Sequence, residues 1–222
     1  QVFATYWFIW HMRVCALLCL VFSVAYGLAD SDDDAHINFI MDRIYVGDQH
    51  AAGDLYELQM LNISAVLNVA WDLDIRYPLK NYTGSIEDDN EHLNIQYDKV
   101  GLVDGTGNQP GTLIAAMLML NQLLTPRNLE QKDKGTFEQP VQNVLVHCHS
   151  GHSRSVTIAA LYLYYTNSNT FRNYEEALLF VKSKRGVLTD PTVPEPPLNL
   201  LAHRVANTFH TTNCSDIFQW NL

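Results

Sequence analysis

The segment between residues 144 and 166 restricts the fold of this chain more than any other. Val144-Leu145-Val146 is a short apolar run typical of a buried strand, and residues 154–166 show the apolar spacing of a helix. Five residues separate Cys148 from Arg154 in the turn between them. A turn of this size directs successive backbone N–H groups towards one point, and the following helix adds its positive N-terminal end. The segment therefore predicts an anion-binding loop between a strand and a helix.

The residue types in this loop predict a reaction at phosphorus. Arg154 can bind two phosphate oxygens with its planar fork, which a lysine could not match. The partial positive charges around the loop favour the thiolate form of Cys148. A thiolate beside a bound phosphate ester is positioned to attack phosphorus. Gly151 permits a tight backbone path, and the hydroxyl of Ser155 could stabilise the thiolate when it leaves.

Such a reaction also needs an acid for the leaving oxygen. Asp104 is the first candidate, because it ends a strand-like run and opens a Gly-rich loop that could move over the site. It would donate a proton in the first step and, as a carboxylate, activate water in the second. Asp98 is the second candidate, but it lies in the middle of the same predicted strand.

Outside this segment, apolar runs and helical spacing alternate along the chain. We expect strands at 43–46, 64–69 and 94–103, and helices at 51–61, 112–124, 174–184 and 198–209. Polar, Gly-rich or Pro-rich composition predicts loops at 71–91, 104–111 and 189–197, and an exposed insertion at 126–142. No linker divides residues 35–209, so the pattern predicts one α/β domain, followed by a tail at 210–222.

Residues 1–29 have the layout of a leader. Met12-Arg13 precedes an uncharged apolar run that ends at Ala29, with a small residue also at Gly27. This predicts a signal peptide if translation starts at Met12, with the residues before it as an extension. The chain would then be secreted or reach the lumen of the secretory pathway. The alternatives are a membrane anchor, which would give membrane association only if the leader is retained, and a cytoplasmic protein.

Charge and cysteine content exclude other classes. The net charge of -10 argues against a nucleic acid as the main ligand. Of four cysteines, two lie in the leader, so the rest of the chain keeps only Cys148 and Cys214 and has no disulfide framework. Glycosylation stays open at three Asn-x-Ser/Thr sequons, Asn62, Asn81 and Asn213.

A metal site is the alternative for the loop, because His147, Cys148, His149 and His152 all carry ligand groups. Their spacing is too tight for a structural zinc site, and side chains around such a loop point in different directions. We therefore expect no metal and no other cofactor. His147 is better explained as a packed side chain that orients the loop.

The stretch His147-Cys148-His149-Ser150-Gly151-His152-Ser153-Arg154-Ser155 resembles the signature of the dual-specificity protein phosphatases, within the wider Cys-x5-Arg tyrosine phosphatase superfamily. Residues 43–47 through 67–70 are similar to the opening strand, helix and strand of this family, and residues 181–185 to a later helix end. The resemblance covers roughly residues 37–209. It implies a single domain with a central mixed sheet flanked by helices.

The same resemblance implies the roles of individual residues. It implies a phosphocysteine at Cys148, a general acid at Asp104 and a shallow pocket that admits phosphotyrosine and phosphoserine or phosphothreonine of a phosphoprotein. The residues expected to bind the phosphate are His149, Ser150, Gly151, His152, Ser153 and Arg154.

Three functions remain open at this point. The first is a protein phosphatase, and the second is a phosphatase of a non-protein ester, such as a phosphoinositide, a glucan phosphate or an RNA 5′ end. Lipid-specific loops of this group tend to carry Lys between Cys and Arg, where this acidic chain has His and Ser, which favours the first. The third is an inactive phosphate-binding module, against which the intact Cys148, Arg154 and Ser155 argue.

Overall fold

The computed structural model describes residues 36–77, 95–125, 128–131, 135–138 and 143–211. The predicted leader at 1–29 lies outside these ranges, as do Asn81 and Asn213. Within them, no helix combines the length and the apolar character needed to cross a membrane. The strands are β1 (Ile37–Met41), β2 (Ile44–Gly47), β3 (Ile63–Ala70), β4 (Gln96–Leu102), β5 (Asn128–Gln131), β6 (Gly135–Glu138) and β7 (Asn143–His147). The helices are α2 (Gln49–Gly53), α3 (Leu55–Met60), α4 (Pro110–Leu124), α5 (Arg154–Thr166), α6 (Tyr174–Arg185) and α7 (Pro196–Thr211).

Five strands form the main sheet in the order β1-β2-β7-β3-β4. β1 pairs antiparallel with β2, whereas β2, β7, β3 and β4 run parallel, which confirms the central mixed sheet. β7 is the middle strand. Because parallel strands end at the same edge of a sheet, the segments that follow β2, β7, β3 and β4 meet there.

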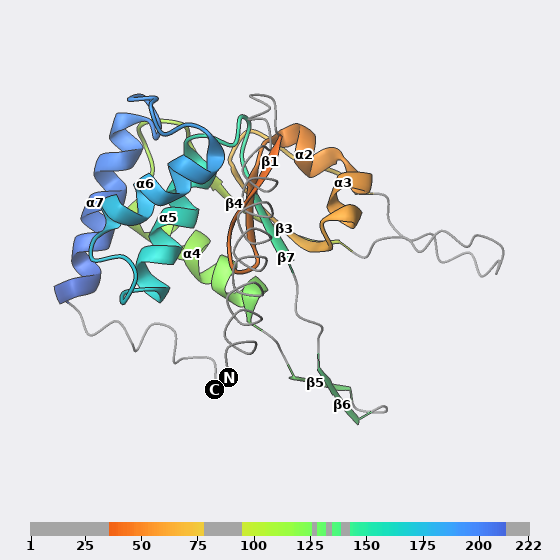
Figure 1. The fold of residues 1–222 in the computed structure, drawn as a ribbon. Helices are drawn as coiled ribbons and strands as arrows, with labels where there is room; N and C mark the ends of the chain where they lie inside the picture. Colours follow the sequence, from red (N-terminus) through yellow and green to blue (C-terminus); the bar gives the residue numbers. More distant parts are fainter. Residues whose placement is uncertain (1–35, 78–94, 126–127, 132–134, 139–142, 212–222) are drawn as a thin grey trace, which may run out of the picture. The chain divides into compact units, whose positions relative to one another are not determined.

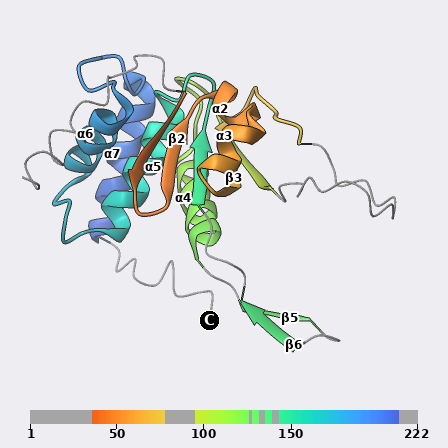
Figure 2. The ribbon, with the colours of Figure 1, turned by 45° about the vertical axis from the view of Figure 1, so that its right-hand side comes forward.

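Helices cover both faces of this sheet. α4, α5, α6 and α7 lie on one face, and the short helices α2 and α3 lie on the other (Figures 1 and 2). The alternation of side chains along β7 explains the division. Val144 and Val146 join the larger buried cluster on the first face, whereas Leu145 packs with Leu58 and Val66 on the second.

The helix predicted at 51–61 is wrong as one continuous element. The structure has α2 and α3 instead, with Asp54 between them. The Asp54 carboxylate accepts a hydrogen bond from the backbone N–H of Glu57, 3.0 Å away, and so begins a new helix. Asp48 caps α2 in the same way, by accepting from His50 and Ala51. These local caps divide a segment whose leucine spacing suggested one helix.

The polar insertion predicted at 126–142 contains two strands. β5 and β6 pair antiparallel, and Gln131 stands opposite Gly135. α5 occupies the predicted residues 154–166, and α6 ends at Gly186, whose φ of 78° is the left-handed conformation expected at such a stop. The elements around the Cys148 loop thus agree with the sequence prediction.

Candidate active site

Cys148 is the first residue after the central strand β7, and Arg154 is the first residue of α5. The loop between them therefore lies at the carboxyl edge of the sheet. Open α/β sheets bind their ligands at this edge. Only 1% of Cys148 is exposed, and its Sγ lies 3.3 Å from the Oγ of Ser155. The structure thus brings the predicted nucleophile and the predicted hydroxyl together.

The side chain of Arg154 is buried, with 3% exposed, and its guanidinium contacts the ends of two neighbouring strands. Nη1 donates to Oδ1 of Asp72 at 2.9 Å and to the carbonyl oxygen of Leu102 at 3.3 Å. Nη2 lies 3.4 Å from Oδ2 of Asp104. Nε has no hydrogen-bond partner among the described residues.

Asp104 follows β4 by two residues, and its side chain is 42% exposed. The amide of Asn108 fixes the start of its loop, because it bonds both the N–H and the carbonyl of Val103. Asp98 lies within β4 and accepts from Gln96 at 2.9 Å. Within the described ranges no hydrogen bond or ion pair joins Asp98 to Arg154, whereas Asp104 lies 3.4 Å from its Nη2.

Asp72 is a site residue that the sequence analysis missed. It lies two residues after β3, in a segment predicted only as a surface loop. Its Oδ2 also lies 3.4 Å from Nε2 of His149. The hydrogen bond from Arg154 is the main cause that holds the pKa of Asp72 below its usual range. Its position just beyond a parallel strand, beside the strand that leads into the loop, is the signal that could have identified it.

The backbone of the loop lies against residues of three other elements, β2, α2 and α6. Gly151 has a φ of 71°, and a Cβ there would come within 2.6 Å of the backbone of Gly47. Arg185, at the end of α6, donates through Nε to the carbonyl of Gly151 at 3.1 Å. The N–H of Gln49 donates to the carbonyl of His149 at 3.0 Å. These bonds occupy two carbonyl oxygens of the loop with donors from outside it, which is compatible with a loop whose N–H groups bind an anion.

The side chains of the loop differ in how far they are exposed. Ser150 is exposed and His152 is half-buried, where burial is the main cause that lowers its pKa. Ser153 is buried, and its Oγ accepts from the backbone N–H of Glu195 at 3.1 Å. A phosphate at this loop would therefore meet backbone N–H groups and Arg154 rather than a ring of side chains.

His147 is fully buried at the end of β7. Its Nδ1 lies 3.2 Å from the carbonyl oxygen of Cys148, and its Nε2 has no partner among the residues that the structure describes. Burial lowers its pKa to about 4. The ring is therefore neutral at pH 7 and contacts the backbone of the nucleophile.

Because buried His147 is neutral in the folded chain, the free energy of unfolding should depend on pH. Between about pH 6.5 and 4 the unfolded chain binds a proton at His147 that the folded chain does not. The free energy of unfolding should therefore fall as the pH drops through this window, by roughly 3 kcal/mol from this residue. In His147→Asn the fall should be smaller by that amount. Urea unfolding of both proteins at pH 7, 6, 5 and 4.5 measures it, and equal pH dependence would contradict the prediction.

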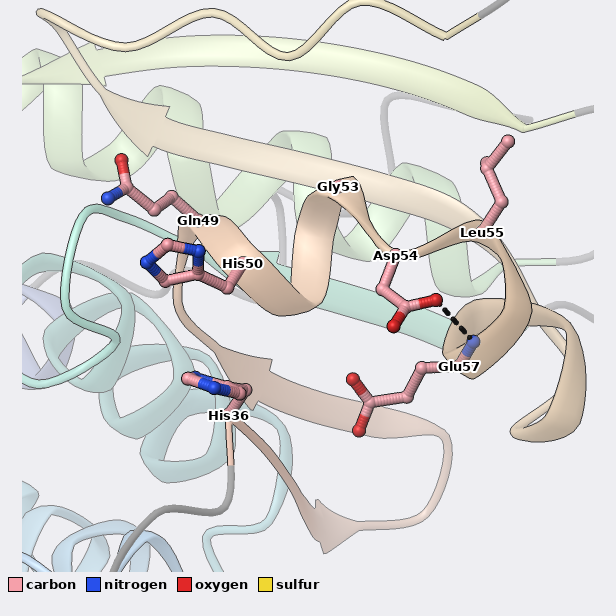
Figure 3. Close-up of a pocket in the computed structure, with 7 residues that line it drawn as sticks. All are labelled: His36, Gln49, His50, Gly53, Asp54, Leu55 and Glu57. Carbon is pink, nitrogen blue, oxygen red and sulfur yellow. Dashed lines mark hydrogen bonds between the residues drawn. The ribbon is translucent and has the colours of Figure 1, made fainter.

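A separate pocket lies on the β2 side of the loop (Figure 3). Its lining consists of His36, Gln49, His50, Gly53, Asp54, Leu55 and Glu57. At one end Nδ1 of His36 lies 2.6 Å from Oδ2 of Asp48, and this bond is the main cause that raises the pKa of His36. Cys148, Arg154 and Asp104 do not line this pocket. Within the described ranges, no three His, Cys, Asp or Glu residues are grouped to hold a metal ion.

Part of this chain is similar to a family model described as the catalytic domain of dual specificity phosphatases. The family model matches residues 132–192, which include the loop from Cys148 to Arg154. The chain is also similar to dual specificity protein phosphatase 2 of Mus musculus, with 29% identity over 154 residues. That match covers 68% of this chain, and it spans only 38% of the length of the relative.

Solved structures share the fold. The mouse putative dual specificity phosphatase complexed with zinc tungstate has a TM-score of 0.57 and 18% identity, with 83% of this chain and 95% of the other covered. The Yvh1 phosphatase domain from Chaetomium thermophilum has a TM-score of 0.55 and 20% identity, covering 80% and 97%. Human DUSP28 has a TM-score of 0.54 and 15% identity, covering 79% and 95%.

Proposed function

We propose that this chain, which resembles the dual-specificity phosphatases in its sequence match and its fold, hydrolyses phosphotyrosine and phosphoserine or phosphothreonine in proteins through a phosphocysteine at Cys148. One observation carries the proposal. Cys148 begins a short loop that leads into α5, whose first residues are Arg154 and Ser155, and the backbone N–H groups of the loop and the helix end favour an anion.

In the first step, the Cys148 thiolate attacks phosphorus while Arg154 and the loop N–H groups hold the phosphate oxygens. The bond between phosphorus and the ester oxygen breaks. Asp104, whose Oδ2 lies 3.4 Å from Nη2 of Arg154, donates a proton to the leaving oxygen.

In the second step, water attacks the phosphorus of the phosphocysteine. The Asp104 carboxylate takes a proton from this water, and the bond between phosphorus and sulfur breaks. The hydroxyl of Ser155, 3.3 Å from Sγ, donates a hydrogen bond to the departing thiolate. Inorganic phosphate then leaves the loop and restores the free site.

A protein substrate is supported by the composition of the loop and of the chain. The loop has no Lys between Cys148 and Arg154, and the net charge is -10, so an anionic lipid surface or an RNA end would meet an unfavourable field. The intact Cys148, Arg154 and Ser155 support an active enzyme over an inactive binding module.

A substrate panel tests this function. Phosphotyrosine peptide, phosphothreonine peptide and a short-chain phosphoinositide are given to the wild type, and phosphate release is measured. We expect both peptides to be hydrolysed faster than the lipid. A higher kcat/KM on the phosphoinositide would overturn the protein substrate, and no release from any of them would overturn the enzyme.

A further inference from the structure

The two edges of the Arg154 guanidinium have different surroundings. Nη1 is occupied, because it donates to both the Asp72 carboxylate at 2.9 Å and the Leu102 carbonyl at 3.3 Å. Nε is buried and has no hydrogen-bond partner within the described part of the chain. An unpaired buried donor is costly, so this N–H is expected to have a ligand in the working enzyme.

A phosphate uses two adjacent donors of a guanidinium, which form two parallel hydrogen bonds. Nε and Nη2 are such a pair. Since Asp72 and Leu102 hold Nη1, the edge left for the phosphate is the one formed by Nε and Nη2. Nη2 is also the atom nearest to Asp104, at 3.4 Å, so this edge brings the phosphate beside the proposed acid.

We propose that Asp72 is a positioning residue for phosphate binding, which holds Nη1 of Arg154 so that Nε and Nη2 are presented to the phosphate. The inference rests on the proposed phosphatase function. Asp72 also contacts the loop itself, because its second oxygen lies 3.4 Å from Nε2 of His149. One carboxylate thus links the guanidinium to the segment whose N–H groups would bind the same phosphate.

The alternative to positioning is competition, in which the Asp72 carboxylate and the phosphate bind the same guanidinium in turn. Its side chain is 55% exposed, and its negative charge opposes a phosphate at the same arginine. If competition dominated, removing the charge would strengthen phosphate binding. If positioning dominates, as we propose, removing the charge weakens binding because the guanidinium loses its fixed orientation.

The test compares Asp72→Asn with Asp74→Asn as its matched control. Asp74 lies two residues further along the chain, is 70% exposed and pairs with Lys99 at 2.7 Å. Inhibition by inorganic phosphate and kcat/KM on a series of aryl phosphates are measured. We expect Asp72→Asn to weaken phosphate inhibition and lower kcat/KM by about 10- to 100-fold. Asp74→Asn should stay within about twofold of the wild type, since exposed ion pairs contribute little.

Two readouts separate positioning from other roles. The loss in Asp72→Asn should be the same for good and poor leaving groups, because Asp72 donates no proton. It should also nearly vanish in an Arg154→Lys background, because lysine has no planar fork to orient. An unchanged or improved kcat/KM, a loss that grows with leaving-group pKa, or a full loss on top of Arg154→Lys would each overturn the proposal.

Phosphate binding without turnover distinguishes this proposal from the proposed function. The shift in melting temperature caused by inorganic phosphate is measured for the wild type, Asp72→Asn and Asp74→Asn. If the wild type hydrolyses no ester but only Asp72→Asn loses the shift, the proposed function fails and the positioning role stands. If the wild type is active and both variants keep the full shift, the positioning role fails alone.

Discussion

Cys148→Ser should abolish hydrolysis of phosphotyrosine and aryl phosphates while phosphate binding remains. A serine hydroxyl is far less acidic than a thiol, so no comparable nucleophile forms at this position, and we expect kcat to fall by at least about 10⁴-fold. The phosphate would still meet the loop N–H groups and Arg154, whose contacts to Asp72 and Leu102 do not involve Cys148. The substitution therefore separates chemistry from binding.

Phosphate release and the phosphate-induced shift in melting temperature measure these two effects. The wild type should also form a covalent phosphoprotein on rapid acid quench, detected as a mass increase on the peptide that contains Cys148. A Cys148→Ser protein that hydrolyses aryl phosphate near the wild-type rate would remove Cys148 from its role. Loss of the phosphate shift in a folded Cys148→Ser would show that the thiol also holds the ligand.

The parts of the site that the sequence predicts are those that local spacing determines. Cys148, Arg154 and Ser155 lie within eight residues, and the strand before them and the helix after them have clear apolar patterns. Asp72 and Arg185 were not assigned roles, because their contacts depend on pairing between distant segments. Asp72 lies 82 residues from Arg154, and Arg185 lies 34 residues from Gly151. No local sequence pattern indicates which distant segments come into contact in the fold.

In the fold, too, some elements are predicted by local sequence patterns and others are not. The buried strand and helix around the loop have the predicted positions, since burial leaves a strong apolar pattern. The division of the 51–61 helix depends on one capping carboxylate, Asp54, and the strands β5 and β6 have short, polar sequences. One capping carboxylate does not interrupt an apolar pattern, and short polar runs add little to one, so the sequence predicts a continuous helix at 51–61 and an exposed insertion at 126–142.

Asp104→Asn should slow the reaction by roughly 10²–10⁴-fold on substrates with poor leaving groups. Asparagine keeps the size of the side chain but cannot donate a proton to the leaving oxygen. The carboxylate lies 3.4 Å from the guanidinium that would hold the phosphate, so it is close to the ester oxygen in either step. The long separation of Asp104 from Cys148 in the chain does not weaken this assignment, because the parallel strands β7, β3 and β4 bring both segments to one edge of the sheet.

The dependence on the leaving group identifies the acid. A good leaving group, such as that of an aryl phosphate with an acidic phenol, departs without a proton, so Asp104→Asn should change kcat/KM little for such a substrate, because kcat/KM reports formation of the phosphocysteine and not its hydrolysis. With an alkyl phosphate or phosphothreonine peptide, the loss should be largest. Asp98→Asn is the matched control, because Asp98 contacts Gln96 within β4 and should leave both rates unchanged. If Asp98→Asn instead produced the leaving-group dependence, the proton would come from Asp98, and the closeness of Asp104 to Arg154 would be electrostatic only.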